Sequence, residues 1–286
     1  MISQYLNPLF FLLLLIILLL TISPIHAKST QQRIVSLSPH LTEMVFALDL
    51  EKQLVGVSDY SDYPYPTGCI DKVCSVKMPI VANYQGADIA AIIRLKPTII
   101  LVWAGGNKAQ DIARLEQLGF TIFRSSPANI EALMEETLSL GATLNAVSKS
   151  KRLHAEMAAQ INKVKSQYAD KEVNALYYMN QQPLSGMAND AWINALLSLC
   201  NITNIYAELP TAFAQFSMAD IIREQPEVVI AASHQDISSV NAFWSAHKRV
   251  YAPKIVSVNP DALHRFTPRV LPEVAVLCKK VHFQNN

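Results

Sequence analysis

Two kinds of apolar segment alternate along most of the chain. Short runs that are apolar at successive positions predict buried strands, and longer stretches with apolar residues three and four apart predict helices. The predicted strands span residues 33–37, 54–57, 98–102, 121–124, 175–179, 228–232 and 255–258. The predicted helices span residues 42–48, 88–95, 109–118, 130–144, 191–200, 217–224, 238–247 and 271–281. This alternation is typical of α/β folds with parallel sheets.

One pattern occurs twice in this alternation. Residues 91–101 and 220–230 both read as a helix, a proline and an apolar strand. The helix must end before the proline, whose ring disfavours helical geometry in the preceding residue, and a strand apolar on both faces suits a parallel sheet. The repeat predicts two similar lobes, although this join is common enough in α/β proteins for a coincidence to remain open.

Between the two halves, residues 145–170 contain no Gly or Pro. Leu153, Met157, Ile161 and Val164 recur at helical spacing, which predicts one long amphipathic helix. About 22 helical residues would span about 33 Å, enough to connect two lobes as a stiff support. An ordinary surface helix is the alternative interpretation.

The N-terminus carries an unbroken apolar run from Leu9 to Leu20. This run is shorter than the ~20 residues that span a membrane, and Pro24 closes it, so we expect a signal peptide cut after Ala27. An uncleaved anchor is the alternative, because no Lys or Arg precedes the run. The expected organisation is a signal peptide at 1–27, an N-terminal lobe at 33–144, a linking helix at 145–170 and a C-terminal lobe at 173–286.

Charge and motifs exclude several functions. The 286 residues include 24 basic and 23 acidic ones, so the balance offers no electrostatic footprint for nucleic acid. The sequence has no nucleophile elbow, phosphate loop or dinucleotide fingerprint, and its histidines are scattered. His40 and Glu43 share a predicted helical face, but two polar residues do not make a catalytic site. We therefore do not expect an enzyme.

Four cysteines, Cys69, Cys74, Cys200 and Cys278, occur in a chain that we expect to be exported. Disulfides are then the expected state, and of the three possible pairings we favour Cys69 with Cys74 and Cys200 with Cys278. A zinc site is the alternative. It would need closer cysteine spacing or neighbouring histidines, and the Cys69–Cys74 pair has neither.

Aromatic residues follow three apolar segments of the first half. Tyr60, Tyr84 and Trp103 lie among turn-forming residues rather than in core patterns. Ligands of open α/β sheets bind outside the carboxyl ends of the strands. These three side chains therefore predict one wall of a binding site for a large and partly apolar ligand, because they offer flat faces.

The second half offers a polar counterpart. Asp261, His264 and Arg265 follow the predicted strand 255–258 and precede the last helix, which predicts a hydrogen-bonding rim. Loop and helix-capping roles are equally open for these residues. Phe213, before the predicted helix 217–224, is a further candidate for the rim.

Several of these segments together resemble a known family. They are residues 33–39, 55–64, 84–86 and 103–107, with Asp261 and residues 265–269. The chain is similar to the periplasmic cobalamin-binding proteins, which are helical-backbone (class III) solute-binding proteins of ABC importers, over nearly the whole mature sequence. The resemblance implies two α/β lobes with central parallel sheets joined by one long backbone helix. It also implies a ligand held between the lobes and docking on an inner-membrane importer made of a permease and an ATPase.

The resemblance also assigns residues. It gives ligand contacts to Tyr60, Tyr84, Trp103, Phe213, Asp261, Ala262, Leu263, His264 and Arg265. Tyr84 and Phe213 stand where the family has tryptophans, and both keep a flat apolar face. Cys200 and Cys278 fall where the family has its disulfide.

Importer docking is where the chain departs from the family. The glutamates that pair with importer arginines are replaced by Ala90 and Ala219. Asp88 and Asp220 lie nearby and are the substitute candidates. A carboxylate moved along a helix points in another direction, so the docking chemistry of this chain is open.

The expectation is therefore a monomeric periplasmic protein that captures cobalamin (vitamin B12) or a related corrinoid and delivers it to an importer. We expect no catalytic cofactor, no protein-bound metal and no nucleic acid. The same fold could instead bind haem or a ferric siderophore, and haem would need an axial His or Tyr. Two further hypotheses are an exported enzyme with a site assembled only in space and a membrane-tethered sensor with an uncut N-terminus.

Overall fold

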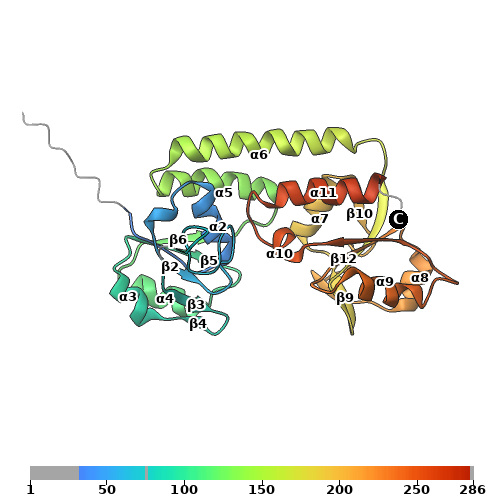
Figure 1. Ribbon diagram of the computed structural model, residues 1–286, viewed down its shortest axis with the longest axis horizontal. Coiled ribbons are helices and arrows are strands. Elements are labelled where there is room, and N and C mark those ends of the chain that lie inside the picture. Colours follow the sequence, from blue (N-terminus) through green and yellow to red (C-terminus); the bar gives the residue numbers. More distant parts are fainter. Residues whose placement is uncertain (1–31, 75–76, 284–286) are drawn as a thin grey trace, which may run out of the picture. The chain divides into compact units, whose positions relative to one another are not determined.

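The computed structural model describes residues 32–74 and 77–283, which form two α/β halves with a long helix between them in sequence (Figure 1). The expected signal peptide at 1–27 lies outside the described residues. Within the part of the chain that the structure describes, no helix combines the length and the apolar character needed to cross a membrane. The predicted class, two α/β lobes with central parallel sheets and one connecting helix, is confirmed. The lobe boundaries drawn from the sequence stay a prediction.

The N-terminal sheet has the strand order β4-β3-β2-β1-β5-β6. Neighbouring strands pair in parallel, except for β3 and β4, which form a hairpin. Its strands are β1 (Ile34–Ser36), β2 (Leu54–Ser58), β3 (Ile80–Asn83), β4 (Gly86–Ala87), β5 (Ile99–Trp103) and β6 (Ile122–Ser125). Its helices are α2 (Pro39–Ala47), α3 (Ile89–Leu95), α4 (Ala109–Gln117) and α5 (Ile130–Thr143), with a 3-10 turn at Glu51–Gln53. The central strands are buried on both faces, as their continuous apolar runs predict.

The C-terminal half holds a parallel sheet in the order β10-β7-β12-β13 and a small antiparallel sheet in the order β11-β9-β8. The parallel strands are β7 (Val173–Tyr178), β10 (Ile202–Asn204), β12 (Val228–Ala232) and β13 (Lys254–Val258). The antiparallel strands are β8 (Asn180–Gln181), β9 (Leu184–Met187) and β11 (Phe213–Gln215). The helices are α7 (Ala191–Ser198), α8 (Met218–Glu224), α9 (Ile237–Ser245), α10 (Pro260–Leu263) and α11 (Val270–Phe283).

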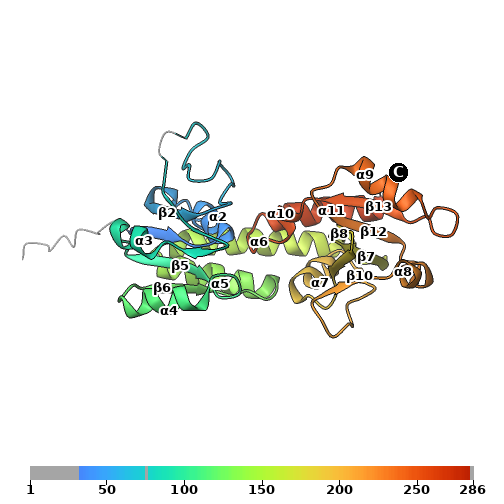
Figure 2. The same ribbon diagram turned by 90° about the horizontal axis from the view of Figure 1, so that it is seen from below.

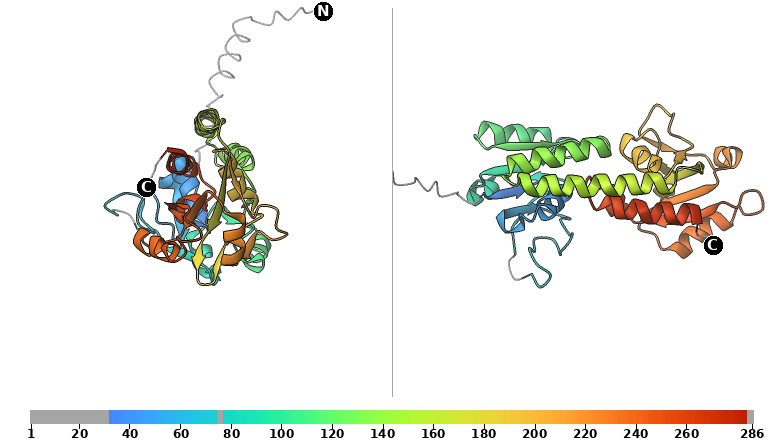
Figure 3. Two further views of the ribbon diagram at one scale, coloured as in Figure 1. Left: turned by 90° about the vertical axis from the view of Figure 1, so that its right-hand side faces the viewer. Right: turned by 90° about the horizontal axis from the view of Figure 1, so that it is seen from above.

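The connecting helix α6 (Val147–Gln167) lies within the predicted range and is a few residues shorter at each end. It packs against α5 and α11, so it touches both halves (Figure 3). Met157, Ile161 and Val164 form its buried face. These three residues belong to one apolar cluster that contains strand residues of both sheets. The helix is therefore part of a core that runs through both lobes.

The repeated helix–proline–strand pattern has the same geometry in both copies. Lys96 and Gln225 cap the C-terminal ends of α3 and α8, and both residues have the left-handed backbone conformation, with φ of 46° and 45°. A proline follows each one, and it has no N–H with which to continue the helix. The strands that come next, β5 and β12, lie in the interior of their sheets. The repeat therefore reflects two similar lobes.

The strands that the hydrophobic pattern does not predict are short. β3, β4, β8, β9, β10 and β11 contain two to four residues each. Runs of this length do not show a period of two clearly enough to separate them from loops. β3, β4 and β10 extend the two larger sheets at their edges, whereas β8, β9 and β11 form the small antiparallel sheet.

Both favoured disulfides are present, Cys69–Cys74 and Cys200–Cys278. All four cysteines are therefore paired, and a zinc site would lack thiolate ligands. Among residues 32–74 and 77–283, no group of three or more His, Cys, Asp or Glu side chains is placed to hold a metal ion. Cys69–Cys74 closes a short turn within residues 59–74, which follow β2 and lie outside the sheet (Figure 2).

Candidate ligand-binding site

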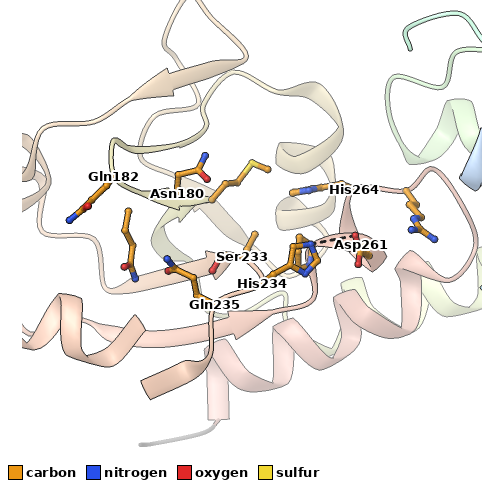
Figure 4. A pocket seen from close by; sticks show the side chains of 12 residues that line it. Asn180, Gln182, Ser233, His234, Gln235, Asp261 and His264 are labelled. Carbon is orange, nitrogen blue, oxygen red and sulfur yellow. Dashed lines mark ion pairs between the residues drawn. The ribbon is translucent and has the colours of Figure 1, made fainter. Parts of the chain in front are cut away.

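A cavity of about 770 Å³ lies at the carboxyl ends of three parallel strands of the C-terminal sheet. Strand β7 leads into it through Met179, β12 through Ser233 and β13 through Pro260. Its lining residues are Met179, Asn180, Gln181, Gln182, Ala232, Ser233, His234, Gln235, Pro260, Asp261, His264 and Arg265 (Figure 4). This is the position at which open parallel sheets bind ligands.

Neutral amides are the most common type of polar side chain in the lining. Asn180 and Gln181 form the short strand β8 after β7, Gln182 lies in the turn that follows, and Gln235 comes from the loop after β12. Each amide can donate and accept hydrogen bonds without a net charge. Gln181 Nε2 and the hydroxyl of Ser233 are buried and make no hydrogen bond with protein. Buried polar groups normally have partners, so these two atoms are exceptions among the residues that line the cavity.

His234 and Asp261 form the only ion pair among the residues drawn in Figure 4, with 3.7 Å between His234 Nε2 and Asp261 Oδ1. The His234 side chain is 74% exposed. Asp261 lies in the first turn of α10, where its backbone N–H donates to the side chain of the capping residue Asn259 at 3.0 Å. The cap fixes the start of α10 and with it the backbone position of Asp261.

His264 lines the same cavity but already has a partner. Its Nε2 lies 2.8 Å from the hydroxyl of Tyr177 on β7. Burial lowers the pKa of His264, with smaller contributions from neighbouring charges, and burial raises the pKa of Tyr177. Both side chains are therefore neutral near pH 7. His264 was predicted to offer hydrogen bonds at a rim. Its Nε2 already contacts Tyr177 and connects the end of α10 to β7, so only the other ring nitrogen is left for a ligand.

Arg265 lines the cavity and also pairs with two carboxylates of the N-terminal lobe. Its Nη1 lies 2.8 Å from Glu43 Oε1 and 2.7 Å from Asp62 Oδ1. Arg269 binds the same glutamate at 2.7 and 3.0 Å, and Thr267 donates to it at 3.1 Å. The Glu43 side chain is 1% exposed. This cluster joins α2 of the N-terminal lobe to the segment between α10 and α11.

A second contact lies beside this cluster. The Arg269 guanidinium stands 4.0 Å from the ring centroid of Tyr63, in the segment that follows β2. Glu43, Tyr63, Thr267 and Arg269 also line a smaller cavity of about 280 Å³ between the same elements. The segment between α10 and α11 therefore contacts the N-terminal lobe on two neighbouring elements.

The predicted aromatics of the N-terminal lobe are not among the lining residues of the large cavity. Tyr60 follows β2 and is 66% exposed, and Tyr84 occupies the turn between β3 and β4 and is 86% exposed. Trp103 ends β5 and packs edge-on against His40 and Phe266, with ring centroids 5.6 and 5.9 Å apart. Tyr60 and Tyr84 present free faces, whereas Trp103 is partly enclosed.

His40, beneath Trp103, belongs to a buried hydrogen-bond chain. Ser38 Oγ lies 2.7 Å from His40 Nδ1, His40 Nε2 lies 3.2 Å from Ser125 Oγ, and Ser125 donates to Glu136 at 2.6 Å. Burial, and to a smaller extent the charge of Arg265, lowers the pKa of His40 to about 3. The imidazole is therefore neutral, and its two partners fix the plane against which Trp103 packs. His40 and Glu43 belong to separate networks and do not act as a pair.

The other residues predicted for ligand binding or importer docking differ in their exposure and in their local hydrogen bonds. Ala262 and Leu263 have buried side chains, so a ligand would meet only their backbone. Phe213 begins β11 and is 47% exposed. Asp88 accepts from the backbone of Ala91 and caps α3, and Asp220 pairs with Arg223 at 2.8 Å. Each aspartate thus has a local partner.

Sequence reasoning missed the polar residues that follow β7 and β12. Asn180, Gln181 and Gln182 follow one strand, and Ser233, His234 and Gln235 follow the other. The rule that selected Tyr60 and Trp103 identifies them too, since both groups come directly after predicted parallel strands. The polar residues directly after the predicted strands 175–179 and 228–232 were therefore the pattern that could have identified this part of the site.

The chain is similar in sequence to periplasmic binding proteins over most of its length. The family model described as periplasmic binding protein matches residues 34–250. A vitamin B12-binding protein from Vibrio cholerae serotype O1 is 31% identical over 252 residues, which cover 86% of this chain and 88% of that protein. A vitamin B12-binding protein from Vibrio parahaemolyticus is 28% identical, with 91% and 92% covered.

Solved structures agree in fold. The crystal structure of the periplasmic vitamin B12 binding protein BtuF of Vibrio cholerae has a TM-score of 0.76 and 29% identity, and covers 87% of this chain and 96% of that one. The periplasmic heme binding protein HutB of Vibrio cholerae has a TM-score of 0.75, with 88% and 100% covered. At 18% identity, the second likeness shows the fold alone.

Proposed function

Since the chain belongs to the periplasmic binding protein family, we propose that it captures cobalamin or a related corrinoid at the carboxyl ends of its parallel strands and carries it without reacting with it. The relatives at about 30% identity are named for vitamin B12. The structure-based support is the large cavity, which offers an extended polar wall to a bulky ligand.

The amide lining carries the proposal. A corrin ring bears neutral amide groups around its edge, and these pair with the amides of Asn180, Gln181, Gln182 and Gln235. Haem and most ferric siderophores present negative charge and favour free cations. The arginine among the lining residues is Arg265, and its guanidinium already lies against two carboxylates. The lining thus suits a neutral polar periphery better than an anionic one.

The exposed aromatics complete the proposed site. Tyr60, Tyr84 and Phe213 keep large exposed faces that water covers in the free protein. Covering apolar rings with a macrocycle removes that area from water and favours binding by about 25 cal/mol per Å² before the losses of association are subtracted. Trp103 contributes its remaining accessible edge. These contacts are proposals, as are those of Asp261 and the backbone of Ala262 and Leu263.

Haem on the same fold is the second candidate, and one observation favours it. His234 lies exposed in the cavity, where an imidazole is able to coordinate iron. The amide lining and the neutralised arginine weigh against it. The two ligands are therefore tested side by side.

The proposal also includes delivery of the bound corrinoid to a membrane importer. We place the mature protein in the periplasm as a monomer, after removal of residues 1–27, and its partner is an inner-membrane ABC importer. Asp88 and Asp220 are the proposed docking carboxylates. Asp88 caps a helix and Asp220 pairs with Arg223, so docking through them requires the importer to compete with these local partners.

Calorimetric titration with cyanocobalamin tests the function. We expect saturable heat at micromolar concentration with one ligand per chain, and weaker or no heat with hemin. The double variant Asn180→Ala/Gln182→Ala should bind about tenfold or more weakly, because two hydrogen bonds are lost at about 1 kcal/mol each. Gln117→Ala, an exposed amide on α4, is the matched control and should bind like the native chain.

Three results would count against this function. Absence of heat with cyanocobalamin at micromolar ligand excludes corrinoid capture. Tighter binding of hemin than of cyanocobalamin assigns the site to haem. Equal affinity of the double variant and the control would show that the ligand makes no hydrogen bonds with the amides of Asn180 and Gln182.

A further inference from the structure

We propose that His234 coordinates the central metal of the captured macrocycle, so that the protein prefers corrinoids whose axial position holds an exchangeable water. The inference rests on the proposed function. It adds a metal–protein bond to the ligand contacts described above, and it makes the chemical form of the cobalt a determinant of affinity.

The location of His234 supports this role. The residue follows β12, the strand that lies between β7 and β13 in the sheet, so it emerges beside the middle of the cavity rather than at one end. Its side chain is 74% exposed. Figure 4 shows Asn180 and Gln182 on one side of His234 and Asp261 on the other. A macrocycle that places its edge amides against Asn180 and Gln182 would bring its centre toward the imidazole.

Asp261 prepares the imidazole for coordination. A histidine that binds a metal through one ring nitrogen usually gives its other N–H to a carboxylate, which fixes the tautomer and raises the basicity of the ligating nitrogen. Asp261 Oδ1 lies 3.7 Å from His234 Nε2, close enough to take this part after a small ring movement. The nitrogen that does not face Asp261 then carries the free lone pair. Asp261 itself is fixed by the Asn259 cap at the start of α10.

Stability does not explain this pair. Both side chains are about half exposed or more, and exposed ion pairs contribute between about 0 and 1 kcal/mol. The other histidine in the lining, His264, already uses Nε2 to contact Tyr177 and is largely buried. Of the two imidazoles that line the cavity, His234 is thus the one that is free to meet a ligand.

The coordination step is a ligand exchange at cobalt. In aquocobalamin, the cobalt–oxygen bond to a neutral water breaks and the lone pair of a neutral imidazole nitrogen forms the new cobalt–nitrogen bond. The released water enters solvent, the other ring nitrogen keeps its proton, and cobalt stays Co(III). Cyanide is a stronger axial ligand than water and is not displaced, so cyanocobalamin tests the site without this bond.

The experiment combines visible absorbance with calorimetry on the mature chain. Adding native protein to aquocobalamin should shift the visible bands to longer wavelength, as exchange of water for imidazole does, and cyanocobalamin should show no such shift. Calorimetry should give a higher affinity for aquocobalamin than for cyanocobalamin. In His234→Ala the shift should vanish and the ratio of the two affinities should fall to about one.

Two further variants sharpen the test. Asp261→Asn should reduce the affinity ratio by about tenfold or more, since partners of metal-binding histidines typically contribute that much. His154→Ala, on α6 and outside the cavity, is the control and should keep both the shift and the ratio.

The outcomes separate this inference from the function on which it rests. Binding of aquocobalamin without a spectral shift, or a shift that persists in His234→Ala, overturns the coordination and leaves corrinoid capture standing. No heat with either corrinoid overturns both.

Discussion

A neutral, buried histidine that packs edge-on against Trp103 is the most informative single residue in the N-terminal lobe. His40 contacts Ser38 and Ser125 through its two ring nitrogens and lies edge-on to Trp103. Protonation would put a charge into this buried chain, and the nearby Arg265 charge opposes it as well. The position of Trp103 thus depends on an imidazole that stays neutral.

This neutrality predicts a pH dependence of stability. The pKa of His40 is about 3 in the folded chain and about 6.5 in the unfolded chain, so below pH 6.5 the unfolded state binds the extra proton. The His40 contribution is present above about pH 6.5 and is lost as the pH falls toward 3, by at most about 1.4 kcal/mol per pH unit. Urea unfolding between about pH 4 and pH 7 measures it.

His40→Gln serves as the comparison, because it keeps hydrogen-bonding capacity and cannot titrate. Its unfolding free energy should fall less steeply with acid than that of the native chain. His264 also has a lowered pKa and acts in the same direction, so some slope remains in the variant. Parallel curves for the two proteins would show that His40 does not govern acid stability.

At the scale of elements, the decisive contact joins α2 to the segment between α10 and α11. Glu43 accepts hydrogen bonds from Arg265, Thr267 and Arg269 while its side chain is 1% exposed. A buried carboxylate with several charged donors is costly to leave incomplete. Since the partners come from the two lobes, this cluster limits their relative movement.

Removing the charge tests this cluster. Glu43→Gln leaves Arg269 and part of Arg265 without their counter-ion, and we expect a loss of about 3–5 kcal/mol in the free energy of unfolding. Glu116→Gln is the matched control: it breaks the exposed Arg124–Glu116 pair, also at 2.7 Å, and should lose about 1 kcal/mol or less. Thermal and urea unfolding of the two variants give the comparison. Equal losses would contradict the account of the cluster.

At the scale of the whole molecule, one apolar core runs through both lobes and α6. Met157, Ile161 and Val164 pack into it, so burial holds the second half of the connecting helix against the core. A support of this kind favours capture with small lobe movements. The aromatic and amide surfaces would then be preformed for the ligand, which lowers the ordering entropy lost on binding.

The sequence predicted those features that neighbouring residues determine. The helix–proline–strand repeats and the long helix follow from residue patterns, because proline and burial act on neighbouring residues. The Cys69–Cys74 pairing is also local, whereas Cys200–Cys278, 78 residues apart, was only favoured among three pairings. The cluster of Glu43 with Arg265 and Arg269 could not be predicted, since more than 200 residues separate its partners along the chain. The amides that line the large cavity follow β7 and β12 directly in the sequence. They were predictable if the rule that ligands bind at the carboxyl ends of parallel strands is applied to both lobes.

A crystal structure of the mature chain grown with cyanocobalamin is the decisive test of corrinoid capture. We expect one corrinoid at the carboxyl ends of β7, β12 and β13, with its edge amides within hydrogen-bond distance of Asn180 or Gln182 and its face near His234. A corrinoid bound away from this cavity, or an empty cavity at saturating ligand, would contradict it.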